Sequence, residues 1–172
     1  MKTEYILNES MERVLGVLTP SNRLVMRVAL HTGLRVGDVL ALRPAQLRRQ
    51  FYVVESKTGK RRRVNLTDEL LADLLVHAGS QWVFPHRCDP TRHRTRQAVW
   101  SDVKRAARAY RLPANVAPHT ARKMYAVELM NRYGDIERVR RALNHSSASV
   151  TVLYACADKL VRQGRRKKGR SW

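Results

Sequence analysis

The sequence contains little cysteine and no long apolar run. Cys88 and Cys156 are the only two cysteines among 172 residues, which is too few for a disulfide framework and suits a reducing compartment. No apolar run approaches the ~20 residues that span a membrane, and residues 1–30 lack the apolar stretch and cleavage site of a signal peptide. We therefore expect a cytoplasmic protein that does not enter a membrane, associated with the nucleoid if it binds DNA.

Patterns that bind a nucleotide or a metal are also missing. No glycine-rich loop of the kind that surrounds phosphates is present, so a requirement for ATP is not expected. His86, Cys88 and His93 offer three possible metal ligands, but a fourth is lacking and no second pair lies nearby. We expect no metal and no other cofactor.

Acidic residues are scarce. Against 34 Lys and Arg there are 14 Asp and Glu, which gives a net charge of +20. Such an excess opposes a compact fold by self-repulsion unless a polyanion or salt offsets it, so nucleic acid is the expected partner. The 44% hydrophobic content is ordinary for a globular protein, and the length fits one domain.

Hydrophobic periodicity and capping residues predict a mainly helical chain. Helices are expected at 10–18, 22–31, 36–42, 67–79, 95–110, 119–133, 135–143 and 146–155. Residues 51–54 and 63–66 read as strands joined by a turn at 57–60. Gly33 should close the second helix, and Trp100 should lie on the inner face of the fifth. We predict an α+β domain, mainly α, with a small antiparallel β-hairpin or three-stranded sheet at one edge.

The positions of Arg35 and Arg122 in the sequence suggest a functional role for both side chains. Arg35 follows a break between two apolar helices, and Arg122 lies in the first turn of the helix that begins at His119. A guanidinium offers a rigid fork of donors that matches two phosphate oxygens. For either arginine alone, a surface or ion-pairing role would be the usual interpretation.

The order of the motifs gives these arginines more weight. Thr32-Gly33-Leu34-Arg35, Ser56-Lys57-Thr58-Gly59-Lys60, His119-Thr120-Ala121-Arg122, Leu143-Asn144-His145-Ser146 and Tyr154 follow one another, with Tyr154 nine residues after His145. This series resembles the catalytic domain of the tyrosine recombinases, the phage integrase family, over about Tyr5 to Tyr154. The resemblance implies a DNA strand transferase that needs no metal because a phosphotyrosyl bond conserves the energy of the phosphodiester.

The resemblance also assigns roles to residues. Tyr154 would be the nucleophile, while Arg35, Arg122 and His145 would bind the scissile phosphate. His119 would assist proton transfer near the tyrosine, and Lys57 would protonate the departing 5′ oxygen. These roles suit the chemistry, because concentrated positive charge favours a phenolate whose ordinary pKa is ~10 and stabilises a charged transition state.

Other residues are expected to support this site. Asp38 can hold Arg35 through an i,i+3 pair, although a solvated helix residue is nearly as good an interpretation. Contacts to the DNA backbone are predicted for Lys60, Arg61, Arg62, Arg63, Arg165, Arg166, Lys167 and Lys168. Asn144 stands where the family has glycine, and asparagine is the next best residue if φ is positive there.

The domain division and partners follow from the same resemblance. Residues 1–162 would form the strand-transfer domain and 163–172 a basic, mobile tail, without the separate N-terminal DNA-clamping domain of relatives. The expected partners are double-stranded DNA and further copies of the chain in a tetramer on two sites, with an accessory DNA-bending protein as a further candidate. Two alternatives stay open: a catalytically silent DNA-binding regulator of the same fold, and a nicking-closing enzyme that resembles type IB topoisomerases.

Overall fold

The computed structural model describes residues 4–112 and 114–144. Its helices are α1 (Asn8–Gly16), α2 (Pro20–Thr32), α3 (Val36–Leu40), the 3₁₀ helix η1 (Pro44–Gln46), α4 (Asp68–His77), α5 (Arg96–Ala109), α6 (His119–Tyr133) and α7 (Ile136–Ala142). Two strands, β1 (Gln50–Val54) and β2 (Arg61–Asn65), pair antiparallel with Gln50 opposite Asn65 and Val54 opposite Arg61. The mainly helical α+β prediction is confirmed, and the sheet of the described residues has two strands.

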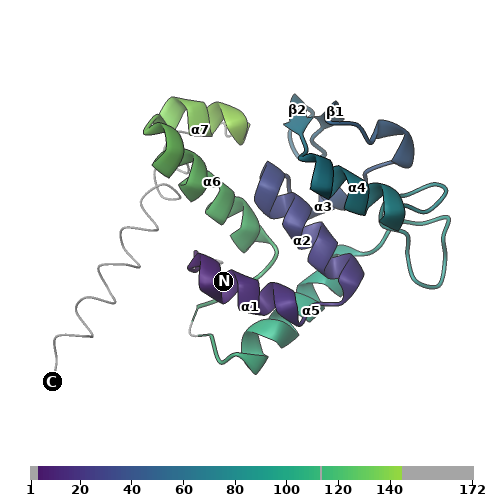
Figure 1. The fold of residues 1–172 in the computed structure, drawn as a ribbon, viewed down its shortest axis with the longest axis horizontal. Helices are drawn as coiled ribbons and strands as arrows, with labels where there is room; N and C mark the ends of the chain where they lie inside the picture. The colour runs from purple at the N-terminus through teal and green to yellow at the C-terminus, as the bar shows by residue number, and fades with distance from the viewer. Residues whose placement is uncertain (1–3, 113, 145–172) are drawn as a thin grey trace, which may run out of the picture.

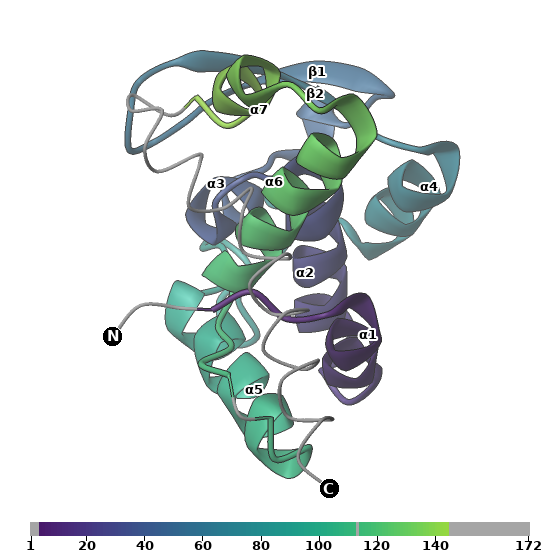
Figure 2. The same cartoon turned by 90° about the vertical axis from the view of Figure 1, so that its left-hand side faces the viewer.

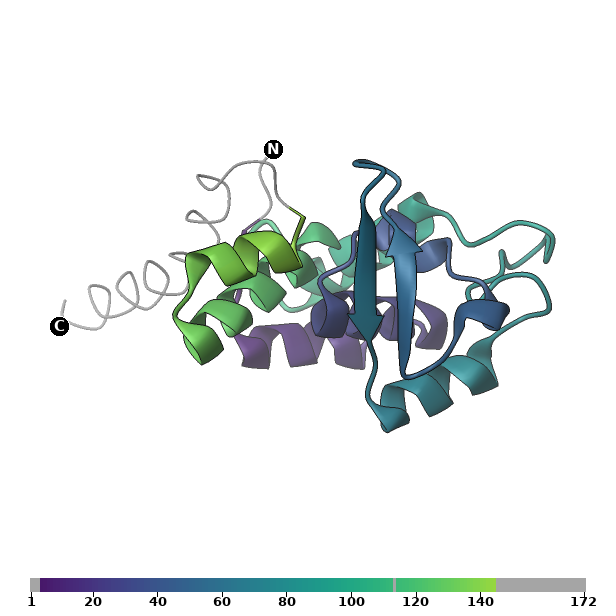
Figure 3. The same ribbon diagram turned by 90° about the horizontal axis from the view of Figure 1, so that it is seen from above.

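Helix α2 forms the centre of the domain. Figures 1 and 2 show it between α6 and α4, with α1 and α5 at one end of the molecule and the β-hairpin with α7 at the other. Its residues Val25, Met26 and Val28 have no exposed surface and belong to the main hydrophobic core. The two strands lie side by side between α4 and the α6–α7 pair (Figure 3). This arrangement brings the hairpin turn toward the start of α3 and the start of α6.

Capping residues fix several of the helix ends. The side chains of Thr67 and Thr95 accept hydrogen bonds from Leu70 N and Ala98 N at the starts of α4 and α5. Asp135 caps α7 in the same way, through Glu137 N and Arg138 N. Gly33 ends α2 in the left-handed conformation with φ 65°, as the sequence indicated.

Several predicted details were wrong. Helix α1 begins at Asn8 rather than at a Ser10 cap, α3 ends at Leu40, and α4 ends at His77 before Gly79 is reached. Trp100 is 43% exposed and does not lie on the inner face of α5. Val99 and Val103 occupy that face with no exposed surface, and Trp100 lies about 100° around the helix from Val99.

Candidate active site

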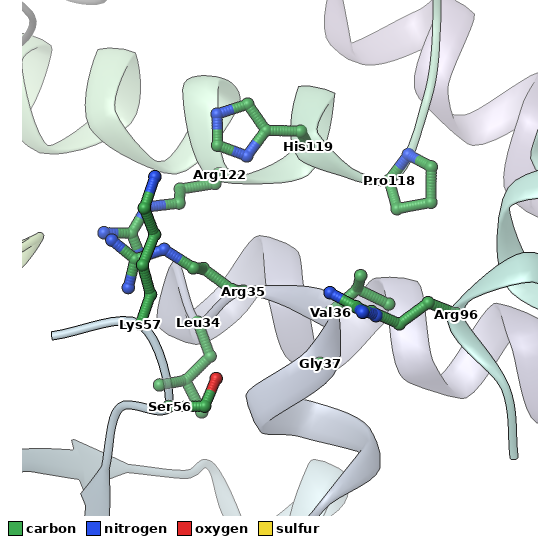
Figure 4. Close-up of a pocket in the computed structure, with 10 residues that line it drawn as sticks. All are labelled: Leu34, Arg35, Val36, Gly37, Ser56, Lys57, Arg96, Pro118, His119 and Arg122. Carbon is green, nitrogen blue, oxygen red and sulfur yellow. The ribbon is translucent and has the colours of Figure 1, made fainter. Parts of the chain in front are cut away.

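A pocket of about 330 Å³ lies where the hairpin turn, the α2–α3 junction and the start of α6 meet. Ten residues line it: Leu34, Arg35, Val36, Gly37, Ser56, Lys57, Arg96, Pro118, His119 and Arg122. Figure 4 shows Arg35, Lys57 and Arg122 converging on one region, with the His119 ring beside them. Four residues proposed from the sequence are thus brought together from three separate parts of the chain.

Not all predicted site residues fall in the part of the chain that the structure describes. His145 and Tyr154, predicted phosphate ligand and nucleophile, lie outside it, as do Arg165, Arg166, Lys167 and Lys168. The last described residue, Asn144, has φ 49°. The expectation that a positive φ is accommodated there by asparagine is therefore confirmed.

Glu55, which sequence reasoning missed, lies at the centre of three arginines. Its side chain has no exposed surface, and its Oε2 accepts a hydrogen bond from Arg35 Nη1 at 2.7 Å. Its Oε1 lies 3.6 Å from Nη1 of both Arg62 and Arg122. Burial alone would raise the pKa of Glu55, but the Arg35 hydrogen bond and the charges of Arg122, Arg35 and Arg62 outweigh burial and lower that pKa.

Arg122 is the most deeply buried of the three arginines, with a side chain 1% exposed. Its Nη1 donates to Gly33 O at 2.6 Å, and its Nη2 donates to Leu143 O. The guanidinium thereby joins the end of α2 to the segment that follows α7. One planar group satisfies two carbonyls and still faces the pocket, which a lysine ammonium could not do with the same geometry.

The structure corrects the prediction for Arg62. We expected this residue to contact DNA phosphates with its neighbours, but it is 9% exposed. Its Nη1 and Nη2 donate to the carbonyls of Gly33, at 3.3 Å, and of Thr32. The reason is strand alternation, since Arg62 shares the inward face of β2 with Val64.

The predicted partner of Asp38 was also wrong. The Asp38 side chain does not bind Arg35, whose carboxylate partner is Glu55. Instead, Asp38 Oδ1 accepts hydrogen bonds from Ser56 N at 2.9 Å and from Ser56 Oγ at 2.7 Å. Arg35 lies before the first turn of α3 and points toward the hairpin, so the i,i+3 geometry does not bring the two side chains together.

His119 opens α6 at the mouth of the pocket, and a substantial part of its surface is exposed to solvent. Desolvation, followed by the positive charges of Arg122, Lys123, Arg35 and Lys57, lowers the pKa of His119 to about 4. The imidazole is therefore neutral near pH 7. A neutral ring can accept a proton, as the assigned role requires.

The remaining predicted DNA contacts in the described part of the chain face solvent. Lys60, Arg61 and Arg63 are exposed on the hairpin, and the guanidinium of Arg61 lies 3.9 Å from the Tyr52 ring centroid. Arg96, at the start of α5, also lines the pocket and was not proposed from the sequence. Its place directly after the Thr95 cap was the signal that could have found it, because helix N-termini favour anions.

Neither a metal-binding cluster nor a membrane-spanning helix is found in residues 4–112 and 114–144. No group of three His, Cys, Asp or Glu side chains able to hold a metal occurs there. His86 Nδ1 accepts a hydrogen bond from Cys88 N at 3.3 Å, and the His93 ring packs edge-on against Trp82. None of the helices described is both long and apolar enough to cross a bilayer.

Comparisons with known proteins agree with this geometry. Tyrosine recombinase XerD of Bradyrhizobium diazoefficiens is 32% identical over 161 residues, covering 79% of this chain and 50% of the relative. The catalytic domain of bacteriophage HP1 integrase has the same fold, with a TM-score of 0.69, 21% identity and coverage of 90% of this chain and 88% of that one. A lambda integrase dimer bound to a COC′ core site gives a TM-score of 0.78 at 18% identity, covering 100% of this chain and 62% of that one.

The chain spans about half the length of the curated relatives it matches. The family model for the phage integrase family matches residues 4–160, nearly the whole chain. It covers the pocket residues and also His145 and Tyr154, the two predicted catalytic residues beyond Asn144. The chain belongs to the phage integrase family.

Proposed function

We propose that this chain is the strand-transfer domain of a site-specific DNA recombinase. The observation that carries the proposal is the pocket itself, in which Arg35, Lys57, His119 and Arg122 converge although they are far apart in sequence. Two guanidiniums, an ammonium and a neutral imidazole suit a phosphodiester that gains negative charge in the transition state. The XerD relative and the lambda integrase complex with its core site support the same function.

The proposed reaction exchanges one phosphoester for another. The Tyr154 phenolic oxygen attacks phosphorus, the bond from phosphorus to the 5′ oxygen breaks, and a 3′-phosphotyrosyl bond forms. The phenolic proton passes to His119, and Lys57 supplies a proton to the departing 5′ oxygen. Attack by a 5′ hydroxyl of another strand reverses these steps, so no external energy source is needed.

Arg35 and Arg122 would hold the non-bridging oxygens throughout, and His145 would assist them. Exposed Lys60, Arg61 and Arg63, with Arg165, Arg166, Lys167 and Lys168, would contact the flanking backbone. Binding through many phosphates makes the DNA affinity fall steeply as salt rises. The logarithm of the binding constant should fall by about 0.9 per phosphate contact for each tenfold increase in salt concentration. We also propose that copies of the chain assemble on DNA as a tetramer on two sites, since each active site cuts one strand.

The test is capture of the covalent intermediate. We would incubate the protein with nicked duplexes that trap a cleaved strand, in parallel with Tyr154→Phe. Wild type should give a 3′-phosphotyrosyl adduct and Tyr154→Phe none. No wild-type adduct on any candidate site would favour a silent DNA-binding regulator. Adducts formed without sequence preference would favour the activity that resembles type IB topoisomerases.

A further inference from the structure

Glu55 connects two parts of the pocket through different atoms. Glu55 Oε2 accepts a hydrogen bond from Arg35 Nη1 at 2.7 Å and a second one from Thr58 Oγ1 at 3.2 Å. Its backbone closes the hairpin turn, because Glu55 O accepts from Thr58 N at 3.2 Å and Gly59 N at 2.8 Å, and Glu55 N donates to Lys60 O at 3.0 Å. The turn enclosed by these bonds carries Lys57. One residue therefore fixes Arg35 and the base of the Lys57 turn at once.

The three arginines do not all lie at the same distance from the Glu55 carboxylate. Arg62 and Arg122, whose side chains are 8% and 1% exposed, lie 3.6 Å from Oε1 and have backbone carbonyls as further acceptors. Arg35 is 21% exposed, yet it receives the short contact. A carboxylate serving only to balance buried charge would be expected nearest the most buried cations. The shortest contact goes instead to Arg35, which is the most exposed of the three arginines and lines the pocket.

We infer that Glu55 is a positioning residue that holds Arg35, and the turn bearing Lys57, in the geometry needed to bind a scissile phosphate; this rests on the proposed function. An arginine bonded through Nη1 to a buried carboxylate samples fewer orientations before DNA arrives, which also restrains its other N–H donors. Preorganisation of this kind acts on the rate of chemistry more than on the affinity for DNA.

The first experiment compares Glu55→Gln with wild type in single-turnover cleavage at saturating DNA. Glutamine keeps the shape of the side chain and loses its charge. We expect the rate constant for adduct formation to fall on the order of 10- to 100-fold, with DNA affinity unchanged or tighter because a negative charge has been removed. Glu69→Gln is the matched control, since Glu69 pairs with Arg27 at 2.9 Å on the surface and should retain the wild-type rate. A wild-type rate constant with only a smaller adduct amplitude would overturn the inference, because misfolding lowers the active fraction alone.

A second variant separates positioning from charge balance. Arg62→Met keeps the aliphatic stem of Arg62 and removes its buried charge. Glu55→Gln should lower the melting temperature, because it removes the negative charge beside three arginines. Adding Arg62→Met should restore part of that loss and leave cleavage slow. Recovery of the cleavage rate together with the melting temperature would overturn the inference, because Glu55 would then serve only to neutralise Arg62.

A third measurement does not depend on activity. The Arg35 Nη–H signals, assigned by their loss in Arg35→Lys, should exchange with solvent faster in Glu55→Gln than in wild type, because Nη1 is the donor to Glu55. Unchanged exchange would overturn the inference. A wild-type protein that forms no adduct would refute the proposed function, and this exchange measurement would still decide whether Glu55 holds Arg35.

Discussion

Asp38 binds Ser56, the residue directly before Lys57, through two hydrogen bonds of 2.9 and 2.7 Å. This contact ties the hairpin turn to α3, and Asp38 is only 3% exposed. Asp38→Ala would leave both the backbone N–H and the hydroxyl of Ser56 without this acceptor. We expect a loss of about 1–3 kcal/mol in the free energy of unfolding, measured by urea denaturation, and slower adduct formation because the Lys57 turn is less restrained.

Ser56→Ala provides the graded comparison. It removes the hydroxyl bond and keeps the backbone bond to Asp38, so it should cost about 0.5–1.5 kcal/mol and slow cleavage less than Asp38→Ala does. Equal effects of the two variants on the cleavage rate would show that the backbone contact contributes nothing to positioning.

Gly33 should be irreplaceable for a steric reason beyond its backbone conformation. A Cβ at this position would lie 2.2 Å from Tyr125 Cδ1, and φ is already 65°. Gly134 has the same φ of 65° with nothing within 4 Å of its would-be Cβ. Gly134→Ala should cost about 1–2 kcal/mol through φ alone, and Gly33→Ala about 1–3 kcal/mol more through crowding. Thermal and urea unfolding would measure the difference, and equal losses would mean that Tyr125 moves aside freely.

The alternation of the hairpin shows what the sequence could have predicted. Phe51 and Val53 point inward along β1, so the same parity carries Glu55 inward, and on β2 Arg62 shares the inward face with Val64. A buried carboxylate requires cationic or hydrogen-bonding partners. A stricter use of the two-residue period would therefore have found Glu55 and removed Arg62 from the predicted DNA contacts.

The partner of Arg35 could not be predicted from strand alternation. Local spacing favoured Asp38 as the partner of Arg35, because i,i+3 pairs are the contacts that a helix offers by itself. The hairpin instead brings Glu55 to Arg35 and Ser56 to Asp38 across the α2–α3 junction. Such pairings depend on tertiary packing, whereas the motif residues Arg35, Lys57, His119 and Arg122 could be recognised from order and spacing. The catalytic roles of these four residues, and those of His145 and Tyr154, remain predictions.

Arg122→Lys and Arg35→Lys should affect the protein differently. Arg122 bonds to both Gly33 O and Leu143 O from a buried position, so a lysine would leave at least one of those contacts unmade. We expect Arg122→Lys to lose about 1.5–3 kcal/mol of unfolding free energy as well as cleavage activity. Arg35→Lys should lose the cleavage activity with a smaller change in stability, since Arg35 is partly exposed. Denaturation and adduct formation measured on both variants would check this; equal stability losses would contradict it.

His119 should titrate far below the ordinary histidine range until DNA binds. Desolvation and the charges of Arg122, Lys123, Arg35 and Lys57 lower its pKa to about 4, from an ordinary value of 6.5. Between these values the unfolded chain binds more protons at this residue than the folded protein does. The contribution of His119 to stability is therefore complete above about pH 6.5 and declines as the pH falls toward 4. His119→Gln should remove that part of the pH dependence.

An NMR titration of the His119 ring, assigned by its loss in the same variant, should show a midpoint near pH 4 in free protein. A DNA phosphate in the pocket opposes the four cations, so the midpoint should rise in the complex. A midpoint near 6.5 without DNA would contradict the electrostatic account of the site.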